Sequence, residues 1–257
     1  GAVEAVLRGA ALAAQANASL YVVHMNAAGE VDQLKYARDK GLKVMGETCP
    51  QYLFFSEKEL EREDGAKWVC SPPVRTADDQ ARLWQGLVEG ILQVVATDHC
   101  AFFYDGNQPI LYEGKPVQIA GKELGRDDFT KIPNGLPGVG DRMPVMWSKA
   151  IGKLNLSQFV KLNCTNPAKI FGLYPRKGDL LVGGDADIVI WDPLKKVRYG
   201  AGIAQHRTDY NLYEGWALTG YPEKVFLRGK LIVDGNTWLG RAGMGKYLFR
   251  TPGAPII

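Results

Sequence analysis

Short apolar runs alternate with helix-favouring segments over the first 100 residues, and this alternation restricts the fold more than any other feature of the sequence. The apolar runs, which indicate buried strands, are Leu20–Val23 in "SLYVVHM", "LKVMGETC" and "LQVVATD". The helical segments are residues 2–16, residues 30–40 and "TADDQARLWQGLVEG", where Thr76 and Asp79 resemble a capping box. Strands and helices in this alternation predict parallel βα units, in an open wound sheet or in a barrel. The fold class is therefore α/β.

Two of these predicted strands end in residues that can bind a metal ion. His24 follows the first strand, and Asp98 ends "LQVVATD". Because the carboxyl ends of parallel strands lie on one face of a sheet, both side chains should approach the same region. Imidazole and carboxylate are suitable zinc ligands. Each residue could equally be a polar group at the solvent-exposed end of a strand. Two ligands are also too few for a catalytic zinc, which takes three protein ligands and an open position.

A long loop follows the third strand. Residues 101–142 are rich in Gly, Pro, Asp and Asn, and "PILYEGKPVQI" has the pattern of a small hairpin. Loops at the carboxyl ends of parallel strands commonly build binding sites. Helical patterns resume at residues 143–151 and 157–162. Asn166 and Pro167 then predict the cap and the first position of one more helix.

The pattern changes after Gly172. "GDADIVIWD" and "KVFLRGKLIVDG" predict short strands, with a tight turn at Arg228–Gly229. We expect residues 1–172 to form one domain and residues 173–257 to form an all-β module. Its last residues, "GRAGMGKYLFRTPGAPII", predict an extended tail.

Composition excludes several classes of protein. The net charge of +3 is too small to indicate binding to nucleic acid or to an acidic membrane. No signal peptide and no apolar run of about 20 residues is found, so neither secretion nor a membrane span is expected. The four cysteines form no CxxC pair, so a structural zinc finger is not expected. Free thiols favour a reducing, cytoplasmic location.

Seven motifs in order carry a resemblance to a known family. They are "LYVVHM", "GLKVMGETCPQYL", "CSPPVR", "ATDHC", "KIPNGLPGVGDRM", "NPAKIFGLYPRKG" and "GDADIVIWD". Together they resemble the dihydropyrimidinase and D-hydantoinase group of the cyclic amidohydrolases. The resemblance implies the C-terminal part of a (β/α)8 barrel, followed by part of a small β-sandwich.

The resemblance also implies an activity and a set of site residues. His24 matches a metal-binding histidine, and Asp98 matches an aspartate that binds metal and serves as general base. Ser71 and Asn134 match positions that bind the cyclic amide, largely through backbone groups. Two divalent metals, usually zinc, would supply an activated hydroxide that opens dihydropyrimidines or 5-substituted hydantoins to N-carbamoyl amino acids.

Other polar residues receive lesser roles. We expect His99 to be structural or to support the site from behind, and His206 to be a surface or packing residue in the β module. Cys100 is close enough in sequence to line the pocket, but it lacks a partner base for a nucleophilic role. Glu47 and Cys49 are expected to support the site without binding metal.

Several parts of the family's pattern are absent from the sequence. It contains no His-x-His, and the family's carboxylated lysine, a further histidine and an oxyanion-stabilising tyrosine all belong upstream of "LYVVHM". We therefore expect an incomplete enzyme that is inactive alone, with the missing N-terminal half as a partner. The family also implies a homo-oligomer, a dimer or tetramer, with contacts from the tail.

Two alternatives stay open. Allantoinase and dihydroorotase are related cyclic amidases, although "CPQYL" and "IPNG" favour the hydantoinase group. Other relatives are non-catalytic scaffolds that have lost metal ligands. The presence of His24 and Asp98 argues against a scaffold, because a scaffold has no use for a carboxylate at the end of a strand.

Overall fold

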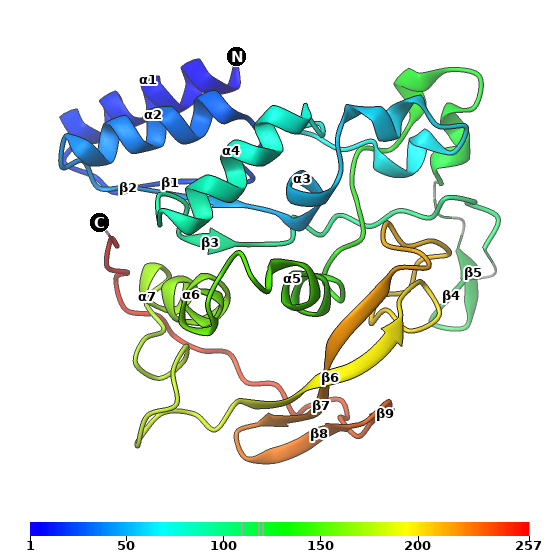
Figure 1. Ribbon diagram of the computed structural model, residues 1–257. Helices are drawn as coiled ribbons and strands as arrows, with labels where there is room; N and C mark the ends of the chain where they lie inside the picture. Colours follow the sequence, from blue (N-terminus) through cyan, green and yellow to red (C-terminus); the bar gives the residue numbers. More distant parts are fainter. Residues whose placement is uncertain (109, 118, 120, 257) are drawn as a thin grey trace.

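A three-stranded parallel sheet organises the first half of the chain (Figure 1). The computed structural model describes residues 1–108, 110–117, 119 and 121–256. The strands lie in the order β1 (Leu20–Val22), β2 (Val44–Thr48) and β3 (Val94–Val95). Leu20 lies opposite Val44, and Thr48 lies opposite Val95. The expected parallel βα units are thus confirmed for these three strands.

Three helices cover one face of this sheet (Figure 1). They are α1 (Ala2–Gln15), α2 (Ala28–Asp39) and α4 (Ala77–Val88). The helices and the sheet share one hydrophobic core, in which Leu34 and Leu83 are fully buried. Gly46 allows this close packing, because a Cβ there would lie 2.5 Å from the Met25 sulfur and 2.6 Å from Leu34.

The capping box predicted for α4 is confirmed. The Thr76 hydroxyl oxygen accepts from the Asp79 backbone N–H at 3.2 Å, and the Asp79 carboxylate accepts from Thr76 N–H at 3.2 Å. The other Asp79 oxygen accepts from the Ala28 N–H at 2.7 Å, at the start of α2. One aspartate therefore caps α4 and joins it to α2.

Further helices lie on the other side of the sheet (Figure 1). They are α5 (Arg142–Ala150), α6 (Leu156–Val160), the π-helical turn η5 (Lys161–Thr165) and α7 (Asn166–Ile170). The prediction that Asn166 caps a separate helix is wrong, because Thr165 and Asn166 both have helical backbone angles and the chain stays helical from α6 to α7. The Asn166 side chain instead donates to the Gln93 carbonyl at 2.8 Å.

β3 is shorter than the predicted strand "LQVVATD". It pairs only with β2 among the described strands. Beyond it, side chains take the place of a further strand: Arg142 donates to the Val95 carbonyl at 3.0 Å, and Asn166 donates to the Gln93 carbonyl. Because β3 pairs with a strand on one side only, the backbone groups on its other side need other hydrogen-bond partners. This limits the length over which the strand is stabilised.

Short elements complete the first part of the chain. They are α3 (Pro50–Phe54), η1 (Glu57–Glu61), η2 (Gly65–Trp68), β4 (Ile110–Tyr112), β5 (Lys115–Val117), η3 (Lys122–Gly125) and η4 (Phe129–Lys131). β4 and β5 form the expected hairpin, with Glu113 and Gly114 at positive φ in its turn. Residues 109 and 118, which the predicted hairpin also included, lie outside the described residues.

A four-stranded antiparallel sheet follows. Its strands, in spatial order, are β6 (Ile188–Arg198), β7 (Ala217–Leu227), β8 (Lys230–Asp234) and β9 (Thr237–Trp238). The predicted turn at Arg228–Gly229 is confirmed, with φ of 47° and 75° at its two residues.

Between β6 and β7 the chain leaves this sheet and packs against the first part of the molecule. Tyr199 and Tyr213 are buried in the same cluster as Phe55 and Trp68. The Tyr213 ring lies 5.1 Å from the Phe55 ring. The last described residues return to α7, where the Ala254 N–H donates to the Lys169 carbonyl at 3.1 Å. None of the helices in the described ranges is long and apolar enough to cross a membrane.

Candidate functional site

His24 and Asp98 leave the sheet at the same end, where the parallel strands have their carboxyl ends. This end is called the sheet edge of Asp98. The strands are parallel, His24 follows β1 and Asp98 follows β3. β2 lies between them, so the two strand ends are roughly 10 Å apart at a strand spacing of about 4.8 Å. Both residues have left-handed backbone angles, with φ of 40° and 47°. This conformation is uncommon for residues with a side chain and is often found at functional sites.

The segment around His24 is fastened to β2. The His24 N–H donates to a Glu47 carboxylate oxygen at 3.3 Å, and the Tyr21 hydroxyl donates to the other oxygen. The Met25 N–H donates to the Glu47 carbonyl at 2.8 Å, and the Thr48 hydroxyl donates to the Met25 carbonyl at 2.8 Å. Glu47 thus holds the backbone of His24, in agreement with its expected supporting role.

Asp98 is exposed, and its charge acts on buried groups that stay protonated. Burial raises the pKa of the Cys49 thiol and of the Tyr52 phenol, and it raises the pKa of Cys70 to about 11. The negative charge of Asp98 adds a smaller contribution to each rise. Neutral thiols are poor nucleophiles and poor metal ligands, so the buried Cys49 and Cys70 are not suited to either role.

The loop that carries Ser71 is held from three directions. The Tyr52 hydroxyl donates to the Pro72 carbonyl at 2.9 Å, and the Cys70 thiol donates to the same carbonyl at 3.2 Å. The buried Asn26 side-chain amide donates to the Pro73 carbonyl at 2.5 Å. Asn26 follows His24 by two residues, so this bond links the His24 segment to the Ser71 loop.

Ser71 and Asn134 meet directly. The Ser71 hydroxyl donates to the Asn134 side-chain carbonyl at 3.1 Å, and both residues are exposed. The Gly135 N–H donates to the Val69 carbonyl at 3.2 Å, which fixes the same two loops at the backbone. The structure therefore brings the two predicted substrate-binding residues, 63 positions apart in sequence, into contact.

The Asn134 loop is in turn fixed to the chain after Asp98. His99 and Leu136 form a parallel bridge, and the Cys100 N–H donates to the Leu136 carbonyl at 3.0 Å. The His99 ring nitrogen Nδ1 accepts from the N–H groups of Gly138 and Val139 at 3.0 and 3.2 Å. His99 is thus a structural residue, as expected, and the Asn134 loop is held to the sheet edge of Asp98.

His206 lies in a separate polar cluster. Its side chain is 3% exposed and its Nδ1 lies 3.8 Å from the Asp141 carboxylate, which also accepts from the Tyr199 hydroxyl at 2.8 Å and from the Asn211 amide at 2.9 Å. Burial lowers the pKa of His206. The packing role expected for His206 agrees with these contacts.

Three residues that shape this site were not singled out in the sequence. Tyr52 lies within the motif "CPQYL", which was a signal for it. Asn26 and Lys122 had no such signal. Lys122 lies in the long loop without periodicity, yet it is buried, and its ammonium group donates to the Val69 and Pro133 carbonyls at 2.9 and 3.1 Å.

The described residues do not by themselves bring together the ligands of a metal centre. Within the described ranges, no three His, Cys, Asp or Glu side chains are placed to share one ion. His24 and Asp98 have suitable donor atoms, but a catalytic zinc takes three protein ligands. A catalytic zinc site would need donors beyond those that the described residues bring together.

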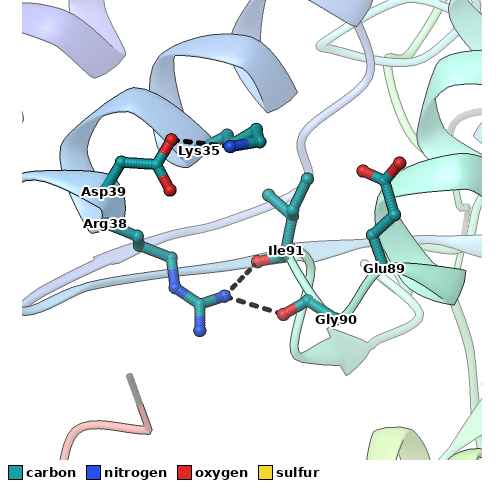
Figure 2. Close-up of a pocket in the computed structure, with 6 residues that line it drawn as sticks. All are labelled: Lys35, Arg38, Asp39, Glu89, Gly90 and Ile91. Atoms are coloured by element: carbon teal, nitrogen blue, oxygen red, sulfur yellow. Dashed lines mark hydrogen bonds and ion pairs between the residues drawn. The ribbon is translucent and has the colours of Figure 1, made fainter.

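A surface pocket lies where the chain enters β3 (Figure 2). It has a volume of about 450 Å³ and is lined by Lys35, Arg38, Asp39, Glu89, Gly90 and Ile91. Arg38 donates to the carbonyls of Gly90 and Ile91 at 2.7 and 2.9 Å, and Lys35 pairs with Asp39 at 2.6 Å. Gly90 and Ile91 precede β3, whereas Asp98 follows it. The Lys35, Arg38 and Asp39 side chains of this pocket thus bond to other pocket residues, and Glu89 accepts from Gln85 at 2.7 Å, so its polar groups are engaged away from the candidate site.

Comparison with known proteins identifies the family. Residues 7–232 match the model of the amidohydrolase family. The chain belongs to this family. Within it, the chain is 44% identical over 95% of its length to a D-hydantoinase of Streptomyces coelicolor, and 41% identical over 95% to a D-hydantoinase of Rhizobium radiobacter. The resemblance to the dihydropyrimidinase and D-hydantoinase group is thereby confirmed.

Solved structures of amidohydrolases agree with the fold. The crystal structure of dihydropyrimidinase from Brevibacillus agri superposes with a TM-score of 0.90 at 43% identity, over 98% of this chain and 52% of that one. The chain likewise spans 50% and 51% of the two D-hydantoinases. It therefore corresponds to about half the length of the amidohydrolases that it matches.

Proposed function

We propose that the protein to which this chain contributes hydrolyses the ring amide of a dihydropyrimidine or a 5-substituted hydantoin to an N-carbamoyl amino acid. One observation carries the proposal: the Ser71–Asn134 pair meets beside the sheet edge from which Asp98 leaves. The similarity to proteins named D-hydantoinase and dihydropyrimidinase supports the choice of substrate.

In the whole protein, the three parallel strands would belong to a (β/α)8 barrel and the sheet β6–β9 to a β-sandwich. The chain spans about half of its relatives, and β1 and β3 each have only one strand neighbour among the described residues. The remaining barrel strands would come from sequence outside this chain. The division into domains at residues 172 and 173 is also part of this proposal. The segment between β6 and β7 would belong to the second domain, although it packs into the core of the first.

Ser71 and Asn134 would bind the ring. Each lies on an exposed loop whose backbone is fixed by hydrogen bonds from buried or partly buried side chains. A planar cyclic amide presents one donor and one acceptor at a fixed spacing, so rigid backbone groups suit it better than mobile side chains. Fixing these groups before binding reduces the entropy lost when the substrate binds.

Asp98 would act as the general base. Its carboxylate takes a proton from the attacking water while the water oxygen bonds to the ring carbonyl carbon. The carbon–nitrogen bond then breaks, its electron pair stays on the ring nitrogen, and Asp98 returns the proton to that nitrogen. The products are a carboxyl group and a carbamoyl amine on one open chain.

We also propose that His24 and Asp98 bind two divalent ions, most readily zinc, once outside sequence supplies the other ligands, among them a carboxylated lysine. Such ions acidify bound water and polarise carbonyl groups. The support is chemical: His24 and Asp98 offer imidazole and carboxylate donors on one sheet edge.

Two further parts of the proposal concern assembly. We propose a cytoplasmic homo-oligomer, a dimer or tetramer, in which the tail contacts a neighbouring subunit. In support, the Tyr247 and Phe249 side chains of the tail are 78% and 90% exposed. Apolar rings at such exposure are candidates for burial against a partner.

The test uses an assembled enzyme, in which this chain is joined behind the first half of the Streptomyces coelicolor D-hydantoinase. The assembled enzyme, loaded with zinc, is incubated with dihydrouracil, hydantoin, allantoin and dihydroorotate, and ring opening is followed by chromatography. We expect opening of the first two substrates only. A folded, zinc-loaded protein that opens no ring would refute the proposal, and preference for either of the last two would assign it to the related cyclic amidases.

A further inference from the structure

Lys122 is the most unusual buried charge close to the candidate site. Its side chain is 1% exposed. Its ammonium group donates to two backbone carbonyls, Val69 at 2.9 Å and Pro133 at 3.1 Å. Within the described ranges, no carboxylate forms an ion pair with it, and the titratable groups that face it are the thiols of Cys70 and Cys100.

The two carbonyls belong to the two loops of the candidate site. Val69 precedes Ser71 by two residues, and Pro133 directly precedes Asn134. The Val69 carbonyl also accepts from the Gly135 N–H at 3.2 Å. One ammonium group therefore connects the backbones of both loops, immediately behind the residues that meet at 3.1 Å.

Lys122 is itself held in place. Its own N–H donates to the Phe103 carbonyl at 2.9 Å, next to a parallel bridge between Phe103 and Gly121. Phe103 lies on the chain that runs on from Asp98 and Cys100. The lysine thus reaches the two loops from a segment attached to the sheet edge of Asp98.

A lysine at this position is costly for folding. A buried ammonium group without a carboxylate loses its hydration and is repaid only by hydrogen bonds. Burial accordingly lowers the pKa of Lys122 to about 8. At neutral pH it remains mainly charged, and charged donors make the stronger hydrogen bonds to carbonyl groups. An apolar side chain of similar length would fill the space at lower cost, so stability alone does not account for this residue.

We propose that Lys122 is a positioning residue, which sets the spacing of Ser71 and Asn134 by drawing the Val69 and Pro133 carbonyls to one ammonium group. The identity of the bound ring rests on the proposed function above. The link between the two loops rests only on the contacts of Lys122.

The test compares two variants of the assembled enzyme. Lys122→Met removes the donors and keeps the length of the side chain. Lys115→Met makes the same change on the exposed strand β5 of the same long loop. For Lys122→Met we expect KM for dihydrouracil to rise about tenfold while kcat changes by less than about threefold, because binding geometry is lost and the base is untouched.

Two further readouts separate positioning from mere stability. Amide hydrogen exchange of residues 69–75 and 132–137 should quicken in Lys122→Met, while the unfolding midpoint does not fall. The KM of the unsubstituted protein should rise above pH ~8, as Lys122 loses its charge, and that of Lys122→Met should lack this rise.

Unchanged KM and unchanged exchange in Lys122→Met would overturn the inference. So would a lowered unfolding midpoint with no change in KM, which is the result expected of a purely structural lysine. If the unsubstituted protein opens no ring, the proposed function fails, and the exchange comparison between Lys122→Met and Lys115→Met then decides the inference about the loops by itself.

Discussion

The two pairs of candidate residues differ in how completely this chain builds them. Ser71 and Asn134 touch at 3.1 Å, and Tyr52, Asn26 and Lys122 fasten their loops. His24 and Asp98 share a sheet edge but follow strands on either side of β2, and no third metal-binding side chain joins them within the described ranges. We call the Ser71–Asn134 pair and these supports the cradle. The described residues thus fix the proposed binding cradle and bring together only part of the proposed reaction centre.

This difference predicts different kinds of defect. Changes at the His24–Asp98 pair should act on the chemical step, whereas changes at the Ser71–Asn134 pair should act on binding. A residue that touches only the reacting groups alters kcat, and a residue that binds ground state and transition state alike alters KM. The comparison fails if both pairs respond in the same way.

The largest effect is expected for Asp98→Asn in the assembled enzyme. Loss of the general base should lower kcat for dihydrouracil about 10³-fold or more, because an amide cannot accept the proton from water. Steady-state kinetics measure this, with Asp39→Asn, an exposed aspartate on α2, as the matched control. If Asp98→Asn keeps more than about a tenth of the rate, Asp98 is not the base.

Next in size is the effect of Lys122 on the pH dependence of stability. Its pKa is lowered from 10.5 to about 8 on folding, so the unfolded chain binds more protons between these two values. The contribution of Lys122 to the free energy of unfolding should therefore rise with pH across this window, by about 3 kcal/mol.

The contribution of Cys70 to the free energy of unfolding changes with pH in the opposite direction to that of Lys122. The effect of Lys122 must therefore be measured as the difference between two variants. The pKa of Cys70 is raised from 9.0 to about 11, so its contribution to stability falls between these values as pH rises. Denaturant unfolding of the unsubstituted protein and of Lys122→Met should be compared from pH 7 to 10.5. Parallel curves would show that Lys122 keeps an ordinary pKa in the folded protein.

The positions of His24 and Asp98 could be predicted from the sequence better than the contacts that hold Ser71 and Asn134. The alternation of strands and helices was enough to place His24 and Asp98 on one edge, since parallel pairing has few solutions. The Thr76 capping box and the Arg228–Gly229 turn are local, and both were predictable from neighbouring residues. Asn166 was not, because its side chain bonds the Gln93 carbonyl, a tertiary contact across 73 positions.

Lys122 shows why the cradle escaped prediction. It belongs to a loop without periodicity, and a lysine in such a loop is ordinarily a solvated surface residue. Only the fold shows that the Val69 and Pro133 carbonyls converge on it, from 53 and 11 positions away. Resemblance to a family identified Ser71 and Asn134, but their supports follow from three-dimensional contacts that no local pattern encodes.

Asn26→Ala should affect both pairs, because Asn26 joins the His24 segment to the Ser71 loop. Its loss removes the part-buried hydrogen bond from the Asn26 amide to the Pro73 carbonyl, which should lower the free energy of unfolding by about 1 kcal/mol. Chemical denaturation measures this, with the exposed Asn107→Ala as control, for which less than about 0.5 kcal/mol is expected. Equal losses in the two variants would mean that the link contributes nothing.

The smallest effect is expected for Ser71→Ala. If the ring is bound by backbone groups at this position, removal of the hydroxyl costs only its hydrogen bond to Asn134, and an exposed bond of this kind contributes about 1 kcal/mol or less. KM for dihydrouracil should then rise less than about fivefold, with kcat unchanged.

Asn134→Ala serves as the matched test of the partner, since it removes the same bond from the other side. A rise well above tenfold for Ser71→Ala, with no comparable rise for Asn134→Ala, would show that the serine hydroxyl itself holds the substrate. The cradle would then be a side-chain site rather than a rigid backbone one.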